Sequence, residues 1–313
     1  CSSDLGETWS ITLNGFTNGS WSWYVKARDG ARNDSGNEVI DFSVDTTVGS
    51  GSGGGGSGGS GSTDGVVTNS QWTGGGAVQS AAGRLFFAMP TSYNKRRGYS
   101  YGWYVCSGTV VTDGGSNRSL ILTAAHCVYD DVYKQFATQV MFIPDQDGTS
   151  ASGSDRDCNN DPIGCWVPSG GVVDVNWTTR TFPDNIPWDY AFYVVNDSGA
   201  HQGAGSNQVL DSAGAAGSMS VQFTAPATGA GAVTHALGYS YSEDPNFMYC
   251  AQDLSTQGQW NWWLGSCGLS GGASGGPWVQ PMNTTTGNGP IISVNSWGYT
   301  TSPGMAEIGR AHV

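Results

Sequence analysis

Residues 119–130 read SLILTAAHCVYD, and no other part of the chain says more about its fold. The apolar run LIL is typical of a short buried strand. It leads into a turn of small residues that ends in His126, next to Cys127. We interpret His126 as functional because a strand followed by a tight turn holds its side chain in place. The chain has four histidines, and we expect the others to be structural or to lie in the terminal tail: His201, His235 and His312.

The strand before His126 belongs to a longer series of similar strands. Between residues 69 and 306, short apolar runs such as RLFFAM, WYVCSGTVV, QVMFI, YAFYVV and ISVNSW alternate with clusters of Gly, Ser, Asn and Asp. No long stretch repeats its apolar residues with the period of a helix. This pattern predicts an all-β domain.

A candidate nucleophile stands in GGASGGPW, residues 271–278, where Ser274 lies between two glycine pairs. A serine hydroxyl is a poor nucleophile unless a base takes its proton, and the base works best when a carboxylate orients it. His126 is the candidate base. Asp189, at the start of the apolar strand in PWDYAFYVV, is the candidate acid. The alternatives are an inert glycine-rich turn, a packed histidine and an aspartate that only caps a turn.

Four motifs resemble the trypsin/chymotrypsin-like serine peptidases: LTAAHC, the DYAF strand start, GGASGGP and NSWGY. They occur in the order His, Asp, Ser of that family and span roughly residues 80 to 306. The wording of the motifs is most similar to the bacterial and fungal branch that includes the glutamyl endopeptidases. The resemblance implies a chymotrypsin-like double β-barrel, with His126 and Asp189 from the first barrel and Ser274 from the second.

The resemblance also implies an activity and a binding site. The chain would be a serine endopeptidase without a cofactor, with the backbone amides of Gly272 and Ser274 as its oxyanion hole. Substrate would be bound by residues at the matching positions: Gly268, Asn295, Ser296, Trp297 and Gly298.

The specificity of such a site is less closely tied to the family. Ser270 stands where the family usually has a cysteine, and neither GSCGLSGG nor SVNSWGYT contains Asp or Glu. We therefore expect an uncharged side chain before the scissile bond. A glutamyl preference is the second choice, because those enzymes usually have a histidine where this chain has Asn295.

Ala273 departs from the family, whose members usually have an aspartate there. That aspartate forms a buried ion pair with the amino terminus released by zymogen cleavage, and the pair orders the oxyanion loop. Alanine has no charge to contribute. We therefore hypothesise that the loop forms without a free amino terminus, held by a disulfide at Cys267.

The seven cysteines become an even set when Cys1 is set aside, as expected in an oxidising compartment. The resemblance implies the disulfide Cys106–Cys127. Cys158 and Cys165 bracket a short loop, which leaves Cys250 with Cys267. Zinc is the alternative ligand for these thiols, but no CxxC or HExxH spacing occurs, and we expect no metal. The cysteines favour a secreted protein.

The composition divides the chain into three parts. Residues 1–47 contain GSWSWYVKARDG and VIDFSVDTT, which resemble the closing strands of a fibronectin type III or bacterial immunoglobulin-like module. Residues 48–68 form a Gly/Ser linker. Residues 69–306 form the peptidase domain. Residues 1–5 and 307–313 match translations of a sequencing adapter, so we expect a truncated reading frame; a lipoprotein cysteine at Cys1 is the alternative.

The charge and hydropathy of the chain limit the classes of partner that we expect for it. With a formal net charge of −13 and only 12 Lys and Arg, nucleic acid is not expected as a partner. No apolar run approaches the ~20 residues of a membrane span. We expect a monomer that acts on proteins or peptides. The acidic stretch 145–161 lacks the spacing of a calcium loop, and we interpret it as solvated.

Two other classes of function remain open from the sequence. A catalytically silent homologue would bind peptides without cleaving them, although such proteins usually lack a member of the triad. An adhesin would use Trp21 and Trp23, but the alternation around them favours burial in a sheet.

Overall fold

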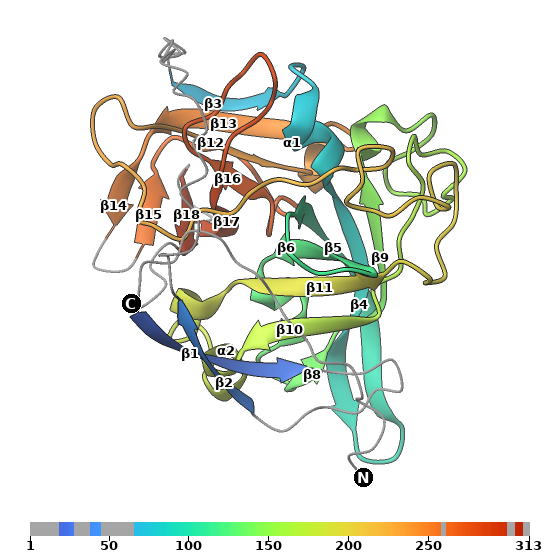
Figure 1. The fold of residues 1–313 in the computed structure, drawn as a ribbon. Helices are drawn as coiled ribbons and strands as arrows, with labels where there is room; N and C mark the ends of the chain where they lie inside the picture. The colour runs from blue at the N-terminus through green and yellow to red at the C-terminus, as the bar shows by residue number, and fades with distance from the viewer. Residues whose placement is uncertain (1–18, 28–37, 45–65, 258–260, 299–303, 309–313) are drawn as a thin grey trace.

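The structure, a computed structural model, describes residues 19–27, 38–44, 66–257, 261–298 and 304–308 (Figure 1). For residues 19–27, 38–44 and 306–308 it describes the backbone only. Two eight-stranded sheets form the framework of the described chain, with strand orders β2-β1-β10-β11-β6-β5-β4-β9 and β14-β15-β18-β17-β16-β12-β13-β3. The prediction of an all-β chain is confirmed.

The first sheet contains the strand before His126. Its neighbouring strands are all antiparallel, and β11 lies between β10 and β6. Its strands are β1 (Gly19–Ala27), β2 (Glu38–Val44), β4 (Ala82–Asn94), β5 (Gly98–Val111), β6 (Arg118–Thr123), β9 (Thr138–Pro144), β10 (Gly170–Asp174) and β11 (Ala191–Asn196). A small separate sheet pairs β7 (Tyr129–Asp130) with β8 (Gln135–Phe136).

The second sheet contains the strand after Ser274. Here β17 pairs with both β16 and β18, and the turn with Ser274 lies directly before β16. Its strands are β3 (Val67–Gln71), β12 (Val233–Gly238), β13 (Met248–Asp253), β14 (Ser255–Gln257), β15 (Asn261–Leu264), β16 (Pro277–Val279), β17 (Ile291–Gly298) and β18 (Met305–Ile308).

The two described amino-terminal strands pair with the first sheet. β1 pairs with β10, with Val25 opposite Asp174, so β1 and β2 extend the first sheet at its edge. The edge of β10 offers unpaired backbone groups, which another strand readily satisfies. The side chains of Trp21 and Trp23, and the linker residues 48–65, lie outside the described residues. At the carboxyl side of that linker, β3 already begins at Val67.

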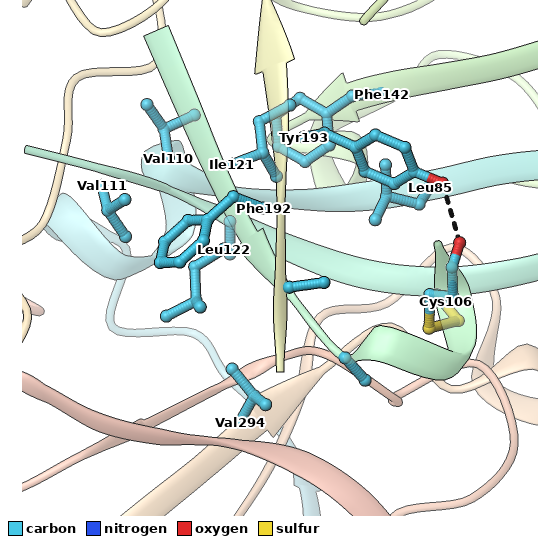
Figure 2. Packing of buried hydrophobic residues seen from close by; sticks show 14 of the residues in the cluster. Leu85, Cys106, Val110, Val111, Ile121, Leu122, Phe142, Phe192, Tyr193 and Val294 are labelled. Atoms are coloured by element: carbon cyan, nitrogen blue, oxygen red, sulfur yellow. Dashed lines mark hydrogen bonds between the residues drawn. A yellow bond between two sulfur atoms is a disulfide. The ribbon is translucent and has the colours of Figure 1, made fainter. Parts of the chain in front are cut away.

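The core explains why the apolar runs form strands. Residues 191–195 of β11 are buried, so both faces of this strand are covered. Figure 2 shows Phe192 and Tyr193 of β11 with Ile121 and Leu122 of β6, packed in one cluster that also includes Val294 of the second sheet. Shared apolar packing of this kind fixes the two sheets against each other.

The helices are short. The α-helices are α1 (Gly76–Ala81) and α2 (Val175–Thr179), and the 3₁₀ turns are η1 (Ala125–Cys127), η2 (Gln146–Gly148), η3 (Ile186–Trp188) and η4 (Tyr241–Glu243). In the part of the chain that the structure describes, none of the helices is long and apolar enough to cross a membrane.

Candidate active site

His126 and Asp189 come together at one end of the first sheet. His126 lies in η1, just after β6, and Asp189 follows η3, just before β11. Because β6 and β11 are neighbours, with Ala191 opposite Thr123, the residues beyond their paired ends meet. The Nδ1 atom of His126 lies 2.7 Å from Oδ2 of Asp189, and the backbone amide of His126 donates to Oδ1 over 2.7 Å.

Asp189 receives a further hydrogen bond from the second sheet. The hydroxyl of Ser296, on β17, donates to Oδ2 of Asp189 over 2.6 Å. Asp189 is only 3% exposed, and three hydrogen bonds hold its buried carboxylate in place. Ser296 was expected to bind substrate through its strand, which stays a prediction, and its hydroxyl also orients the acid.

The environment of His126 shifts its basicity. Burial of the ring lowers its pKa, but the negative charge of Asp189 and its hydrogen bond, with a contribution from Asp131, raise the pKa above the usual value. The side chain remains 35% exposed, so part of the ring is open to solvent. An imidazole held in this way can accept a proton and stay charged beside a carboxylate.

Ser274 lies close to the disulfide that flanks His126. The backbone amide of Ser107, on β5, donates to the carbonyl of Ser274 over 2.7 Å. The Cys127 Sγ lies 3.9 Å from the same carbonyl, and a ring nitrogen of His126 lies within 4.8 Å of the sulfur atoms of Cys106 and Cys127. The disulfide therefore brings the serine turn and the histidine together.

Ser274 is half-buried. Within the described ranges its hydroxyl has no hydrogen-bond partner, and it is not bonded to Nε2 of His126. Catalytic hydrogen bonds are often long in ligand-free structures and shorten when substrate binds. The arrangement thus leaves the hydroxyl available.

The loop before Ser274 has a backbone shape that requires glycine at position 272. Gly272 has a φ of +100°, and a Cβ there would come within 2.7 Å of the Tyr239 carbonyl oxygen, so only glycine fits. The amides of Gly272 and Ser274 donate to no group among the residues that the structure describes. Unpaired amides in a tight turn can bind a developing oxyanion.

A buried serine that the sequence analysis did not single out holds this loop. The hydroxyl of Ser107 donates to the carbonyl of Gly272 over 2.9 Å and accepts from the amide of Tyr239 over 2.8 Å. The following segment adds two bonds: the amide of Tyr241 donates to Gly271, and the amide of Ser270 donates to the Ser240 hydroxyl. The partners of Ser107 lie more than 130 residues away along the chain, so no local pattern could identify it.

Asn295 lies beneath the nucleophile turn, to which its side chain is bonded. Its side chain is fully buried, and its Nδ2 donates to the carbonyls of Leu237 and Ala273. Its Oδ1 accepts from the indole of Trp278 over 2.6 Å. Both polar atoms of the Asn295 side chain are thus used inside the protein, and the expectation that Asn295 binds substrate stays a prediction for its backbone.

The other expected binding residues lie on two segments near the serine turn. Gly268 donates its amide to Thr68 on β3 over 2.6 Å. Trp297 lies 6.2 Å from the ring of Trp263, and a Cβ at Gly298 would come within 2.7 Å of the Gly304 carbonyl oxygen. Residues 299–303, between these strands, lie outside the described part.

A carboxylate from another loop approaches the same region. Glu243, in η4, accepts from the hydroxyl of Ser242, which also bonds to the hydroxyl of Ser270. Glu243 accepts from Asn69 as well, over 3.4 Å. The sequence motifs around Ser274 do not include Glu243, so they gave no sign that this carboxylate lies beside Ser270.

The structure contains three disulfides, Cys106–Cys127, Cys158–Cys165 and Cys250–Cys267. These are the pairs that the sequence analysis expected. The first encloses His126 and is drawn in Figure 2, where the Tyr193 hydroxyl donates to the Cys127 carbonyl over 2.8 Å. Cys106, Cys127 and His126 are close enough to hold a metal ion, but both sulfurs are bonded to each other.

The two remaining described histidines pack among aromatic rings. His235 is buried, with its ring 6.4 Å from Trp72 and 6.1 Å from Tyr249. His201 lies 4.5 Å from Trp166, and its Nε2 is 2.7 Å from the Asn196 carbonyl oxygen. Both lie on other elements than the His126 site, as a structural role requires.

A buried ion pair joins the two sheets behind the serine loop. Arg84, on β4, is fully buried, and its guanidinium lies 2.6 Å from the Asp244 carboxylate and 5.6 Å from the centre of the Tyr239 ring. Burial lowers the pKa of Arg84, although Asp244 acts against this change. The cation therefore contacts both ends of the segment 239–244, which supports the serine loop.

We expect Asp244→Ala to cost about 3–5 kcal/mol of unfolding free energy, because it leaves the buried charge of Arg84 without a partner. The double variant Arg84→Met/Asp244→Ala should recover most of this loss, since an apolar side chain of similar length fills the site. Urea unfolding of the single and double variants measures both values. Equal losses in the two variants would contradict the prediction.

Two β-sheets that meet where a His–Asp pair faces a glycine-rich serine turn have the fold of the chymotrypsin-like serine proteases. Comparison with known structures shows this fold. The chain is similar to the protease Anisep from Arthrobacter nicotinovorans, with 25% identity, a TM-score of 0.56, and coverage of 77% of this chain and 93% of that protein.

Two further solved structures have the same fold. A thermostable serine protease from an extremophilic microorganism is 24% identical, with a TM-score of 0.54 and coverage of 74% and 92% of the two chains. A Glu endopeptidase is 13% identical, with a TM-score of 0.52 and coverage of 78% and 92%. No protein-family profile and no curated protein matches the chain. The likeness to these solved structures shows that the protein has the fold of a serine protease.

Proposed function

We propose that the protein is a secreted serine endopeptidase that acts through Ser274, His126 and Asp189. The observation that carries this proposal is the His126–Asp189 pair, whose Nδ1 and Oδ2 atoms are 2.7 Å apart. Beside this pair lies Ser274, whose hydroxyl and backbone amide have no partner within the described chain. The three disulfides support secretion, because such bonds persist in oxidising compartments.

The geometry supports acyl transfer by the following steps. Ser274 Oγ attacks the peptide carbonyl carbon while Nε2 of His126 takes its proton, and Asp189 stabilises the imidazolium that forms. The amides of Gly272 and Ser274 bind the oxyanion. The imidazolium then protonates the leaving amine. Water completes the reaction by the same route and releases the acid from Ser274.

For the residue before the scissile bond we propose an uncharged side chain. Trp263 and Trp297, whose ring centres lie 6.2 Å apart, offer apolar rings beside the expected binding residues. The carboxylate of Glu243, beside Ser270, would repel an acidic side chain, which supports this choice over a glutamyl preference.

We propose a peptidase domain that starts with β3 rather than at residue 69, because Thr68 accepts a hydrogen bond from Gly268. Residues 48–65 would then be the linker. The likeness of residues 1–47 to a fibronectin type III module remains a hypothesis.

A fluorophosphonate probe tests the function directly, because it reacts with a serine only when a base activates it. We expect one label per chain, on Ser274, and hydrolysis of casein by the same sample. A folded sample that takes up no label and cleaves no peptide would favour a binding protein without catalytic activity.

We also expect activity to be independent of a released amino terminus. Ala273 is fully buried and uncharged, and the serine loop is held by Ser107 and residues 239–241 instead. The full chain and a chain that begins at Val66 should therefore cleave one peptide with kcat/KM values within about twofold of each other. Activity only in the shortened chain would refute this expectation.

A further inference from the structure

The hairpin of β4 and β5 extends well beyond the first sheet (Figure 1). The two strands pair with each other as far as Asn94 opposite Gly98. Among the described strands, β6 pairs with β5 only from Thr109 to Val111, and β9 pairs with β4 only as far as Ala88. The outer half of β5 thus has an edge that pairs with no described strand, whereas on the β4 side the hydroxyl of Tyr133 donates to the Thr91 carbonyl over 3.0 Å.

One face of this outer half consists of aromatic side chains. Tyr99, Tyr101 and Trp103 alternate along β5 and so share a face, and Tyr93 lies directly opposite Tyr99. In the order Tyr93, Tyr99, Tyr101 and Trp103 they are 57, 37, 47 and 52% exposed. The Tyr93 and Tyr99 rings are 4.9 Å apart. An exposed aromatic patch of this kind marks an interaction surface, where Tyr and Trp contribute strongly to binding.

The same part of the molecule gathers positive charge. Lys95, Arg96 and Arg97 form the exposed turn of the hairpin, and the guanidinium of Arg156 lies 4.1 Å from the centre of the Trp103 ring. These are four of the 12 Lys and Arg in a chain of net charge −13. A cationic patch on an otherwise acidic protein is complementary to an acidic partner.

The hairpin also leads into the active site. β5 runs from this turn to Cys106 and Ser107, and the backbone of Ser107 is bonded to Ser274 and to the Thr123 hydroxyl. Beyond Ser107, toward the turn, the β5 edge is open. An extended chain that leaves Ser274 along this edge can add to it as a strand. The distance from Ser107 to Arg97 is about 33 Å at roughly 3.3 Å per residue.

We propose that the β4–β5 hairpin binds an acidic, extended segment of a polypeptide substrate on the leaving-group side of the scissile bond. The proposal rests on the peptidase function proposed above, in which the acyl side of the substrate pairs with Ser296 to Gly298. The open backbone edge favours a polypeptide, because a polysaccharide cannot add to a sheet. The aromatic face provides contact area, and the cations select for acidic residues.

The experiment compares peptides that share one scissile sequence and differ after it. One continues for about ten residues with Asp and Glu, another continues with Ser and Gly for the same length, and a third ends as a short amide. We expect the acidic tail to raise kcat/KM about tenfold over the neutral tail at low salt, and less at high salt.

The triple variant Lys95→Ser/Arg96→Ser/Arg97→Ser should lose this preference, and Tyr99→Ser/Tyr101→Ser should weaken binding of both tails. Cleavage of the short amide should stay within about twofold in each variant. Arg180→Ser is the matched control, because it removes an exposed cation that lies over the Trp188 ring outside the hairpin, and it should keep the preference.

Binding is measured separately on the full chain carrying Ser274→Ala, by fluorescence anisotropy of the acidic tail alone. A preference that survives the triple variant, equal cleavage of acidic and neutral tails, or binding of polygalacturonate in place of the acidic peptide would each overturn the proposal. Failure to cleave the short amide, with tail binding intact, would instead overturn the peptidase function alone.

Discussion

Ser274→Ala is expected to lower the rate of peptide hydrolysis by a factor on the order of 10⁴–10⁶, because the members of a triad act as a unit. No other hydroxyl is held at the turn that the Ser107 amide and the Cys106–Cys127 disulfide place beside His126. Initial rates on casein and on a chromogenic peptide measure the loss, and fluorophosphonate labelling should disappear with it.

The control is Ser270→Ala, which removes a hydroxyl from the same loop. The Ser270 hydroxyl bonds to Ser242 and lies away from His126, so its loss should reduce activity by no more than about tenfold. Ser274→Ala should unfold at nearly the native urea concentration, since the Ser274 hydroxyl has no hydrogen-bond partner in the described chain. Substantial cleavage by the Ser274→Ala variant would sink the assignment of the nucleophile.

Asp189→Asn is expected to lower kcat by about 10⁴, because an amide cannot accept from all three donors that now surround the carboxylate. An amide NH₂ group in place of Oδ1 would face the backbone amide of His126, and in place of Oδ2 it would face both Nδ1 of His126 and the hydroxyl of Ser296. In the second orientation the NH₂ group donates to Nδ1. The imidazole would then take the wrong tautomer, with its proton on the nitrogen that must act as base. Single-turnover rates separate this chemical step from binding.

The same substitution should shift the pH dependence of activity. The base must be neutral, so the native rate falls as the pH drops through the raised pKa of His126. Asp189 is the main cause of that increase, and without its charge the acidic midpoint of kcat/KM should move to lower pH.

Ser296→Ala separates charge from orientation. It keeps the carboxylate of Asp189 and removes one donor to it, so the acidic midpoint should change little and kcat should fall by about tenfold. An unchanged pH profile in Asp189→Asn would show that Asp189 does not control the basicity of His126.

Much of the fold could be predicted because its signals are local. The apolar runs at β6 and β11 are short enough to be strands, and buried strands need apolar side chains on both faces. The motifs around His126, Asp189 and Ser274 lie at the ends of such strands, where loops place side chains into a site. The side-chain pattern alone therefore indicated an all-β domain and the candidate triad.

The bonds that hold the candidate site could not be predicted in this way. Ser107 supports Gly272, Arg84 pairs with Asp244, and the Ser296 hydroxyl reaches Asp189, each across more than 100 residues of chain. A polar residue in a strand has the same sequence signature whether it faces solvent or a distant loop. Only the packing of two sheets decides which.

The sequence by itself thus determined the strand pattern, the cysteine set and the chemical groups at the ends of β6, β11 and the turn before β16. The tertiary structure decided how these groups are held. It turned Asn295 into the interior and brought Glu243 beside Ser270, and it opened the outer edge of β5. The physical reason is that strand propensity and apolar periodicity act between near neighbours, whereas hydrogen bonds and ion pairs between sheets depend on register, which burial of both sheets sets together.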